Sequence, residues 1–260
     1  MNDVPVLAAV RRYLTEAVSG RNPAMLAEIL VPDYRFDGGG TPVIGRDDTY
    51  IPMVSTYLAG EPTIDTAAHE IVTDGRHAAV WLTKHTDSPR AAWEAVLIYR
   101  ARGTLLERCW SEQDWATRRR QLKGQQPPGV TPTPAPGVWE TPPDTPDAGT
   151  EKAATAWLTG LPDLAAAFPD HTPRPVLDVT EVEIGCLFTA GARFAFHVTH
   201  RGAYLDGLAG CGEHRGHPAE LNLAGLGTLT EAGVSCTRAI ADATELRRRL
   251  TAPAAAASRA

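Results

Sequence analysis

Three side chains in the first half of the chain have the chemistry of an acid–base site. Tyr13 lies in a segment with helical spacing of apolar residues, Asp37 ends a short β-type segment just before three glycines, and Asp114 follows a long β-type run. A carboxylate in an apolar pocket has its pKa raised by lost hydration, so it can exchange protons near neutral pH. A phenol directed at a carbonyl oxygen stabilises an enolate as it forms. The three groups would suffice for enolisation followed by isomerisation, ring closure or elimination, without a metal or cofactor.

Each of these residues also has a purely structural interpretation. Asp37, just before the glycines, can start a turn by bonding to nearby backbone. Asp114 can be the N-cap of the basic helix that follows, where Asp is favoured, and Asp242 repeats this position near the end of the chain. Tyr13 can be a core residue of an amphipathic helix. Because capping alone explains the repeated aspartate, Asp37 is the stronger catalytic candidate.

One sequence pattern occurs twice in the chain. Residues 114–122 read DWATRRRQL and residues 242–250 read DATELRRRL, each after β-type sequence. Self-similarity at a long period indicates two copies of one domain. The stretch between them is rich in Pro, Gly and Thr, a composition typical of an extended spacer. We expect the side chain of Trp139 to dock this spacer onto one of the domains. The predicted division is a first domain at 1–124, a linker at 125–150, a second domain at 151–252 and a disordered tail at 253–260.

The elements that would position the candidate residues form an α+β pattern. Apolar spacing predicts helices at 4–20, 23–30 and from 47 or 48 to 58, with a short strand at 34–37. Turn signals then separate four antiparallel strands at about 63–73, 77–86, 92–102 and 105–111. The second block offers one or two helices at 150–168 and strands at 176–189, 194–201, 219–230 and 234–241. It has no counterpart of the first two helices and first strand, so the second copy is predicted to be incomplete at its N-terminal side.

The composition narrows the class of protein. A chain of 260 residues with 43% hydrophobic and 22% charged residues has room for two globular domains. A net charge of -6 argues against a nucleic-acid partner, which favours a basic surface. No apolar stretch reaches the length of a membrane span, and the N-terminus lacks the pattern of a signal peptide. Four cysteines without paired spacing indicate reduced thiols, so the expected location is the cytoplasm.

Short motifs in both blocks carry a family resemblance. They are RRYL at 11–14, YRFD at 34–37, CWSEQD at 109–114, FPD at 168–170, THRG at 199–202, GHP at 216–218 and the closing helix at 242–250. These motifs resemble the ketosteroid-isomerase-like superfamily (nuclear-transport-factor-2-like cones), and within it the SnoaL-like polyketide cyclases. The resemblance implies two cone-shaped domains, each a curved antiparallel sheet packed against helices around an apolar pocket, with the second copy truncated.

The resemblance also implies roles for particular residues. In ketosteroid-isomerase-like enzymes an Asp after the first strand is the base and a Tyr of the first helix donates to the oxyanion; Asp37 and Tyr13 hold these places. In SnoaL-like cyclases the acid–base Asp follows the last strand, where Asp114 and, in the second copy, Asp242 lie. The second oxyanion donor has no clean match, because Glu94 needs a one-residue shift and Trp93 competes for the position. The residues expected to line the pocket or bind substrate are Tyr50, Met53, Tyr57, Asp65, Trp81, His85, Trp93, Trp110 and His200. Of these, Trp81 and His85 share one strand face and line the pocket only if that face is concave.

The predicted function is a cofactor-independent cyclase or isomerase acting on an apolar polyketide-like or terpenoid-like intermediate of secondary metabolism. No cofactor or metal is expected, since the spacing of Cys211, His214 and His217 supplies no fourth ligand. Epoxide opening stays open as an alternative and needs a second carboxylate beside Asp37, for which Asp65 is the candidate. A protein that only binds an apolar ligand, or a scaffold, is the other alternative.

The expected partner is a small apolar substrate, with no nucleic acid and no membrane. We expect the two domains to pack sheet against sheet as a pseudo-dimer within the chain, whether the whole protein is a monomer or a dimer.

Overall fold

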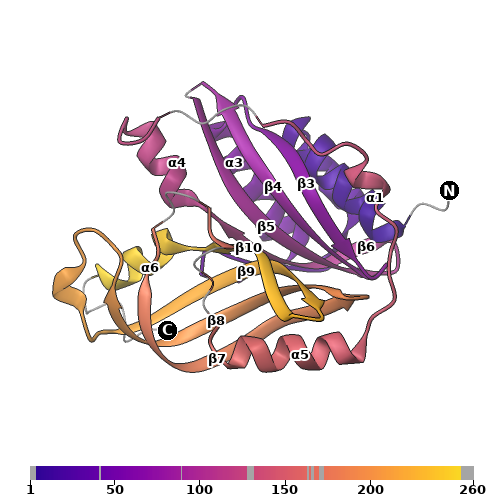
Figure 1. Ribbon diagram of the computed structural model, residues 1–260. Helices are drawn as coiled ribbons and strands as arrows, with labels where there is room; N and C mark the ends of the chain where they lie inside the picture. Colours follow the sequence, from indigo (N-terminus) through magenta and orange to yellow (C-terminus); the bar gives the residue numbers. More distant parts are fainter. Residues whose placement is uncertain are drawn as a thin grey trace.

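The computed structural model describes residues 4–40, 42–88, 90–127, 132–162, 164, 167–169 and 173–252. In this part of the chain, a six-stranded and a four-stranded sheet lie face to face, with helices on their outer sides (Figure 1). The predicted α+β class with two curved sheets is therefore confirmed. The predicted tail at 253–260, linker residues 128–131 and the Asp of the FPD motif lie outside the described residues.

The larger sheet has the strand order β2-β1-β6-β5-β4-β3. Only β1 and β6 pair in parallel; the other neighbours are antiparallel. A tight turn joins β3 to β4, where the Asp74 carboxylate accepts hydrogen bonds from the backbone N–H groups of Arg76 (2.8 Å) and His77 (2.5 Å). The strands are β1 (Leu30–Gly38), β2 (Val43–Ile44), β3 (Asp65–Thr73), β4 (His77–Asp87), β5 (Arg90–Arg102) and β6 (Leu105–Gln113).

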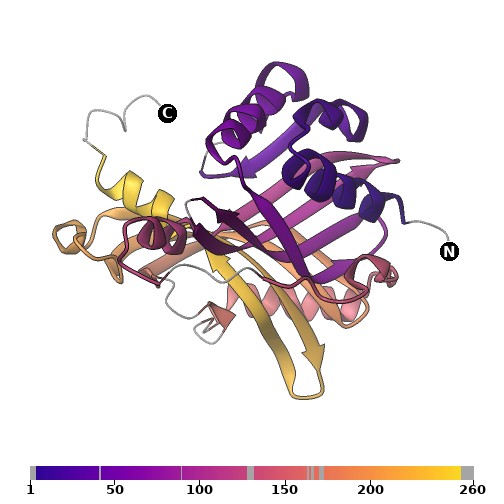
Figure 2. The same ribbon diagram turned by 90° about the horizontal axis from the view of Figure 1, so that it is seen from above.

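Helices cover the outer face of this sheet (Figure 2). The first begins as α1 (Pro5–Arg12), with proline at its first turn, and continues as a π-helical segment over Tyr13–Ser19. Its apolar residues, among them Val10 and Leu14, are almost fully buried against the sheet; full burial of each such side chain contributes about 1.5–3 kcal/mol. The other helical elements are Pro23–Met25, α2 (Leu26–Ile29), Arg46–Tyr50, α3 (Ile51–Gly60) and α4 (Trp115–Leu122).

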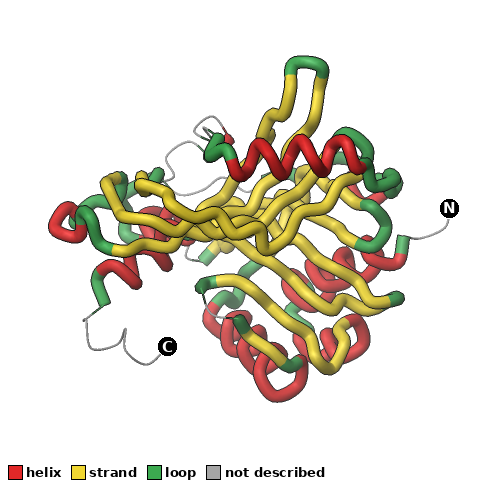
Figure 3. The backbone as a smooth tube through the Cα atoms, turned by 90° about the horizontal axis from the view of Figure 1, so that it is seen from below, coloured by secondary structure: helices red, strands yellow, loops and turns green. Residues whose placement is uncertain are grey.

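The smaller sheet has the order β10-β9-β8-β7 and is covered on its outer face by α5 (Figure 3). Its elements are α5 (Ala148–Thr159), β7 (Val176–Ala190), β8 (Arg193–Asp206), β9 (Pro218–Thr230), β10 (Gly233–Ala241) and α6 (Ala243–Leu250). Two buried rings fill the outer face: Phe194 and Phe196 lie directly over glycines of β9. At Gly225, an added Cβ would be 2.5 Å from the Phe196 ring. This face is therefore a packed core.

The two sheets pack against each other through a shared apolar cluster. Its members from the larger sheet are Val72, Ala79, Val96, Ile98 and Trp110, and those from the smaller sheet are Cys186, Phe188, Ala190, Ala195, Ala224, Leu226 and Ile240. One buried polar pair crosses the same interface, with His197 Nε2 2.9 Å from Glu112 Oε1. Burial raises the pKa of Glu112, and the hydrogen bond from His197 opposes this rise.

The linker runs along the edges of both sheets. Backbone hydrogen bonds join Ala135 to Ala68 of β3 (2.9 Å) and Gly191 of the β7–β8 turn to Thr145 (2.9 Å). Trp139 is partly buried and packs against the core of the first half, so it docks the linker. No helix in the described residues is both long enough and apolar enough to cross a membrane.

Candidate functional site

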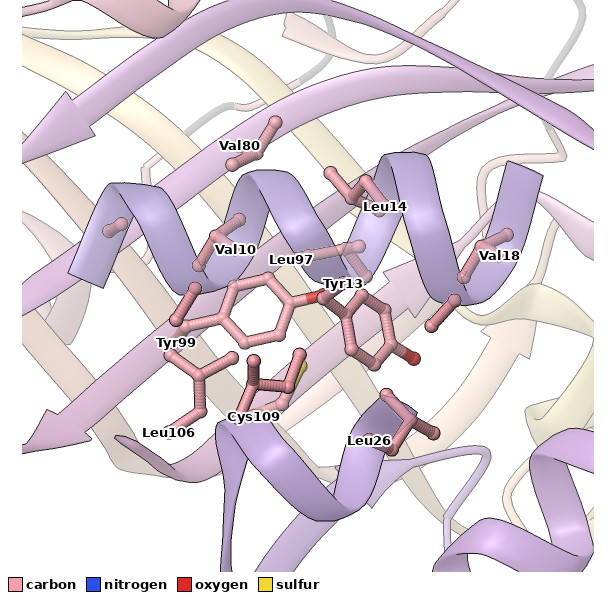
Figure 4. Close-up of a cluster of buried hydrophobic side chains, with 14 of the residues drawn as sticks. Val10, Tyr13, Leu14, Val18, Leu26, Val80, Leu97, Tyr99, Leu106 and Cys109 are labelled. Atoms are coloured by element: carbon pink, nitrogen blue, oxygen red, sulfur yellow. The ribbon is translucent and has the colours of Figure 1, made fainter. Parts of the chain in front are cut away.

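A cavity of about 220 Å³ lies between the helices and the larger sheet. Figure 4 shows side chains of the first helix packed against those of the sheet, with the rings of Tyr13 and Tyr99 side by side. The centroids of these two rings are 5.5 Å apart. The lining is mostly apolar and aromatic, with a few polar groups, which is the usual composition of a small-molecule site. The lining residues are Tyr13, Val18, Phe36, Gly38, Gly39, Tyr50, Met53, Val54, Tyr57, Lys84, Leu97, Tyr99, Cys109, Ser111, Gln113 and Trp115.

Strand alternation decides which side chains reach the cavity. Successive residues of a strand point to opposite faces. In β5, Leu97 and Tyr99 line the cavity, whereas Val96 and Ile98 belong to the cluster between the sheets. In β6, Ser111 and Gln113 line the cavity, and Trp110 packs between the sheets. The two faces of the larger sheet thus have separate roles, one forming the cavity and the other the sheet interface.

Phenol groups are the main hydrogen-bonding groups of the cavity. The hydroxyls of Tyr13 and Tyr50 are 2.7 Å apart and hydrogen-bonded. The Tyr57 hydroxyl is buried and has no hydrogen-bond partner among the described residues. Burial raises the pKa of all three phenols, so they stay protonated and can donate at any physiological pH.

Lys84 of β4 is the one charged side chain among the described residues that line the cavity. It is 7% exposed, and its Nζ lies 5.4 Å from the centroid of the Tyr57 ring. Burial lowers the pKa of Lys84 to about 8, because the charged form loses hydration. Sequence reasoning missed this residue, although Lys84 has the same strand parity as Val80 and Leu82, which face the helices. Alternation places Lys84 on the same face as these apolar residues, but only the structure shows that this face lines the cavity.

Asp37 does not line this cavity, which corrects its predicted position as the pocket base. In β1 the cavity is lined by Phe36 and Gly38, and the side chain between them points to the opposite face. There Asp37 accepts hydrogen bonds from Arg35 Nε (2.9 Å) and Arg108 Nε (2.6 Å), and it lines a separate polar cleft of about 230 Å³ between the sheets. A single-residue step along a strand reverses the face that a side chain takes.

The other predicted carboxylates also lie away from the cavity. Asp114 is buried but caps α4, accepting a hydrogen bond from the backbone N–H of Thr117 (3.0 Å). It is the preceding residue, Gln113, that lines the cavity. Asp65 is exposed at the start of β3 and accepts from the backbone N–H of Thr66. Asp37 and Asp65 therefore do not face each other across the cavity, as epoxide opening by that pair would require.

The predicted aromatic and histidine residues fall into two groups. Tyr50, Met53 and Tyr57 line the cavity together with Tyr13. Trp93 supports it from behind: the side chain is buried, and its Nε1 donates to Gln113 Oε1 (3.3 Å).

The remaining predicted side chains lie elsewhere, which corrects their expected place in the pocket. By strand alternation, Trp81 and His85 lie on the face of β4 that is turned toward the smaller sheet. The indole N–H of Trp81 donates a hydrogen bond to Glu94 (2.8 Å), and the guanidinium of Arg238 lies 4.1 Å from the centroid of the Trp81 ring. Trp110 packs between the sheets. His200 belongs to β8 of the smaller sheet, where burial lowers its pKa.

The side chains of the loop that contains Cys211, His214 and His217 are not arranged as metal ligands. The rings of His214 and His217 are in a T-shaped contact with centroids 5.4 Å apart, and Cys211 is fully buried. Among the described residues, no group of three His, Cys, Asp or Glu side chains is arranged to hold a metal ion.

Comparison with known proteins identifies the domain that carries the cavity. Residues 10–109 match the family model of the SnoaL-like domain, so this part of the chain is a SnoaL-like domain, as its motifs predicted. The match runs from the end of α1 to the first half of β6 and contains Tyr13, Tyr50, Tyr57 and Lys84. No sequence among the curated proteins matches the chain.

Solved structures similar to the chain come from several bacteria. A SnoaL-like polyketide cyclase from Agrobacterium tumefaciens is 19% identical, with 47% of this chain and 99% of that chain covered and a TM-score of 0.39. An LEH-like epoxide hydrolase from M. tuberculosis is 14% identical, with 48% and 95% covered and a TM-score of 0.38. A nuclear-transport-factor-2-like protein of unknown function from Cytophaga hutchinsonii is 10% identical, with 40% and 86% covered and a TM-score of 0.34.

Proposed function

We propose that the chain is a cofactor-independent cyclase or isomerase that transfers protons on an apolar carbonyl compound bound in the cavity of the SnoaL-like domain. One observation carries this proposal: an apolar cavity brings buried phenols and a buried lysine together. Enzymes commonly lower a lysine pKa to about 7–8 by burial, because a base works best near the operating pH. The pKa of Lys84, about 8, lies in this range.

The reaction begins with removal of a proton from the carbon next to the carbonyl group. The neutral Lys84 amine takes this proton, and the C–H electron pair moves through the new C=C bond onto the carbonyl oxygen. A phenol O–H of the Tyr13–Tyr50 pair donates a hydrogen bond to that oxygen as charge develops. Return of the proton at another carbon gives isomerisation, and attack of the enolate carbon on a second carbonyl closes a ring.

The cavity also indicates the kind of substrate. At about 220 Å³ it is slightly smaller than the usual range for small-molecule sites, about 300–1,000 Å³. Aromatic and aliphatic side chains, such as Phe36, Met53 and Trp115, form most of its wall. This lining suits a compact polyketide-like or terpenoid-like intermediate better than a sugar or nucleotide.

Epoxide opening by paired carboxylates is not supported, because no Asp or Glu is found among the described residues that line the cavity. The proposal thus keeps the predicted class of reaction but moves the base from Asp37 to Lys84.

Enolisation can be tested without the natural substrate. Purified protein is incubated in D₂O with an apolar aryl ketone such as 2-tetralone, and deuterium uptake at the α-carbons is followed by mass spectrometry. We expect uptake faster than in buffer, with the rate rising through about pH 8 to a plateau as Lys84 loses its proton. We expect Tyr13→Phe and Lys84→Met each to lower the rate about 100-fold.

Lys123→Met, which removes an exposed lysine, is the matched control and should exchange at the wild-type rate. Equal rates in Tyr13→Phe, Lys84→Met and wild type would contradict the mechanism. Quenching of Trp fluorescence by the ketone without any exchange would show a binding protein instead of an enzyme.

A further inference from the structure

The chain uses lysine very rarely, and one of its lysines lies in the cavity. The sequence contains 22 arginines but only three lysines. Lys123 and Lys152 are exposed, whereas Lys84 is 7% exposed. Arginine stays protonated in proteins, while a buried lysine readily loses its proton and can then act as a nucleophile. The cavity therefore holds the one type of cation that can become a neutral amine.

The surroundings of Lys84 allow this neutral form. Among the described residues that line the cavity there is no carboxylate to hold the amine as an ammonium ion. The Cys109 thiol and the Glu61 carboxylate act to raise the pKa of Lys84, but the Glu61 carboxylate is paired with Arg118. Burial outweighs this attraction and brings the pKa to about 8.

The phenol ring of Tyr57 lies near the amine. The Tyr57 ring centroid is 5.4 Å from Lys84 Nζ, and its buried hydroxyl has no partner among the described residues. Burial raises the pKa of Tyr57, so the phenol keeps its proton. A nucleophilic amine and a phenol thus line the same mostly apolar cavity.

We propose that Lys84 reacts covalently with an aldehyde or ketone ligand in this cavity and forms a Schiff base. This inference rests on the proposed function in one respect, namely that the cavity binds carbonyl compounds. Lysine amines of other enzymes form such intermediates with carbonyl substrates when desolvation lowers their pKa.

The step is balanced without a cofactor or an oxidant. The Nζ lone pair attacks the carbonyl carbon, the C–N bond forms and the carbonyl π electrons move to oxygen, giving a carbinolamine after proton transfer. Tyr57 protonates the leaving hydroxyl, one water departs and the C=N bond forms. The amine proton that is lost restores the phenol. The product is a neutral imine. While Lys84 is held in this imine it cannot also act as the base, so the Schiff base and direct proton removal are two separate uses of the same amine.

Reductive trapping tests the proposal directly. The full-length protein is incubated with 2-tetralone and sodium cyanoborohydride, then analysed by intact mass and peptide mapping. We expect one adduct, equal to the ketone minus one oxygen atom, located at Lys84 and formed at least ten times faster than adducts at Lys123 or Lys152. These two exposed lysines serve as internal controls. Equal labelling of all three lysines would overturn the proposal.

A variant of Lys84 and a competing ligand without a carbonyl group test whether the adduct forms at Lys84 inside the cavity. Lys84→Arg keeps the positive charge but cannot form the imine, so it should lose the adduct; full labelling of this variant would refute the assignment. If Lys84→Arg does not fold, tetralin, which has the same shape but no carbonyl group, should protect Lys84 of the wild type. Failure of tetralin to protect would count against a reaction inside the cavity.

The trapping experiment tests the Schiff base, and the deuterium experiment tests the proposed proton transfer, so their results can be told apart. Deuterium exchange without trapping would overturn the Schiff base while leaving the proposed function in place. Trapping without exchange would establish the Schiff base and refute proton-transfer catalysis on that ketone.

Discussion

Asp242 provides a quantitative test of how burial affects this fold. Its carboxylate caps α6 by accepting hydrogen bonds from the backbone N–H groups of Thr244 (3.1 Å) and Glu245 (2.9 Å). The side chain is buried, and burial together with the nearby charge of Glu112 raises its pKa to about 7 from the ordinary 3.8. Because the pKa is higher in the folded state, folding binds a proton between these two pH values. The contribution of Asp242 to stability is therefore greatest below pH 3.8 and falls as the pH rises towards 7.

The size of this effect follows from the two pKa values. At about 1.4 kcal/mol per pH unit, ionisation of Asp242 costs about 4 kcal/mol of folding free energy at pH 8.5 and about 2 kcal/mol at pH 5.5. Asp242→Asn removes the charge and keeps a good N-cap. We therefore expect the variant to gain stability relative to wild type, and the gain to grow by about 2 kcal/mol between pH 5.5 and 8.5.

Urea denaturation at the two pH values measures this difference, since other titrating groups are common to both proteins. Asp242→Ala, which loses the cap as well as the charge, should be about 0.5–2 kcal/mol less stable than Asp242→Asn. A difference between Asp242→Asn and wild type that does not change with pH would show that burial does not raise the pKa of Asp242.

Two further predictions concern the packed face of the smaller sheet and the cleft between the sheets. In Gly225→Ala the new Cβ would be 2.5 Å from the Phe196 ring, so we expect a loss of about 1–3 kcal/mol in urea denaturation. Gly60→Ala, where nothing lies within 4 Å, is the control and should change stability by less than about 0.5 kcal/mol. Asp37→Asn weakens the ion pairs with Arg35 and Arg108 in the cleft and should cost about 1 kcal/mol in the same assay. A loss above 3 kcal/mol would show that these pairs act as buried ones.

The fold class could be predicted because apolar spacing and turn signals recur along the chain. The strands at about 77–86 and 92–102 correspond closely to β4 (His77–Asp87) and β5 (Arg90–Arg102). Strand β6 extends to Gln113, two residues beyond the prediction, and both added positions matter for the site. Gln113 lines the cavity, and Glu112 joins His197 between the sheets.

The face on which Asp37 lies could not be predicted from local sequence. Strand β1 pairs with β6 through an irregular register between Leu30 and Arg35, and such an irregularity changes which face the later residues take. For Trp81 and His85, the sequence could not show whether their face of β4 is the one that lines the cavity. Alternation placed both on one side of β4, but only the positions of the helices and the second sheet decide which side is the cavity.

The first helix shows another limit of sequence patterns. A single helix was predicted at 4–20, and the structure has α1 followed by a π-helical segment that begins at Tyr13. Apolar spacing of the α-helical kind cannot reveal such a change of winding, which rotates the residues beyond it. The sequence predicted correctly that Tyr13 lies in the pocket, because this residue is at the start of the π-helical segment and is not rotated by it.

We propose that the chemistry takes place in the cavity with Lys84, and not in the cleft with Asp37. The most direct test compares α-proton exchange of one apolar ketone in D₂O by wild type, Lys84→Met and Asp37→Asn, with folding of each variant confirmed by circular dichroism. We predict that Asp37→Asn exchanges at the wild-type rate and that Lys84→Met is slower by about 100-fold. Loss of exchange in Asp37→Asn, with the wild-type rate retained in Lys84→Met, would contradict the claim.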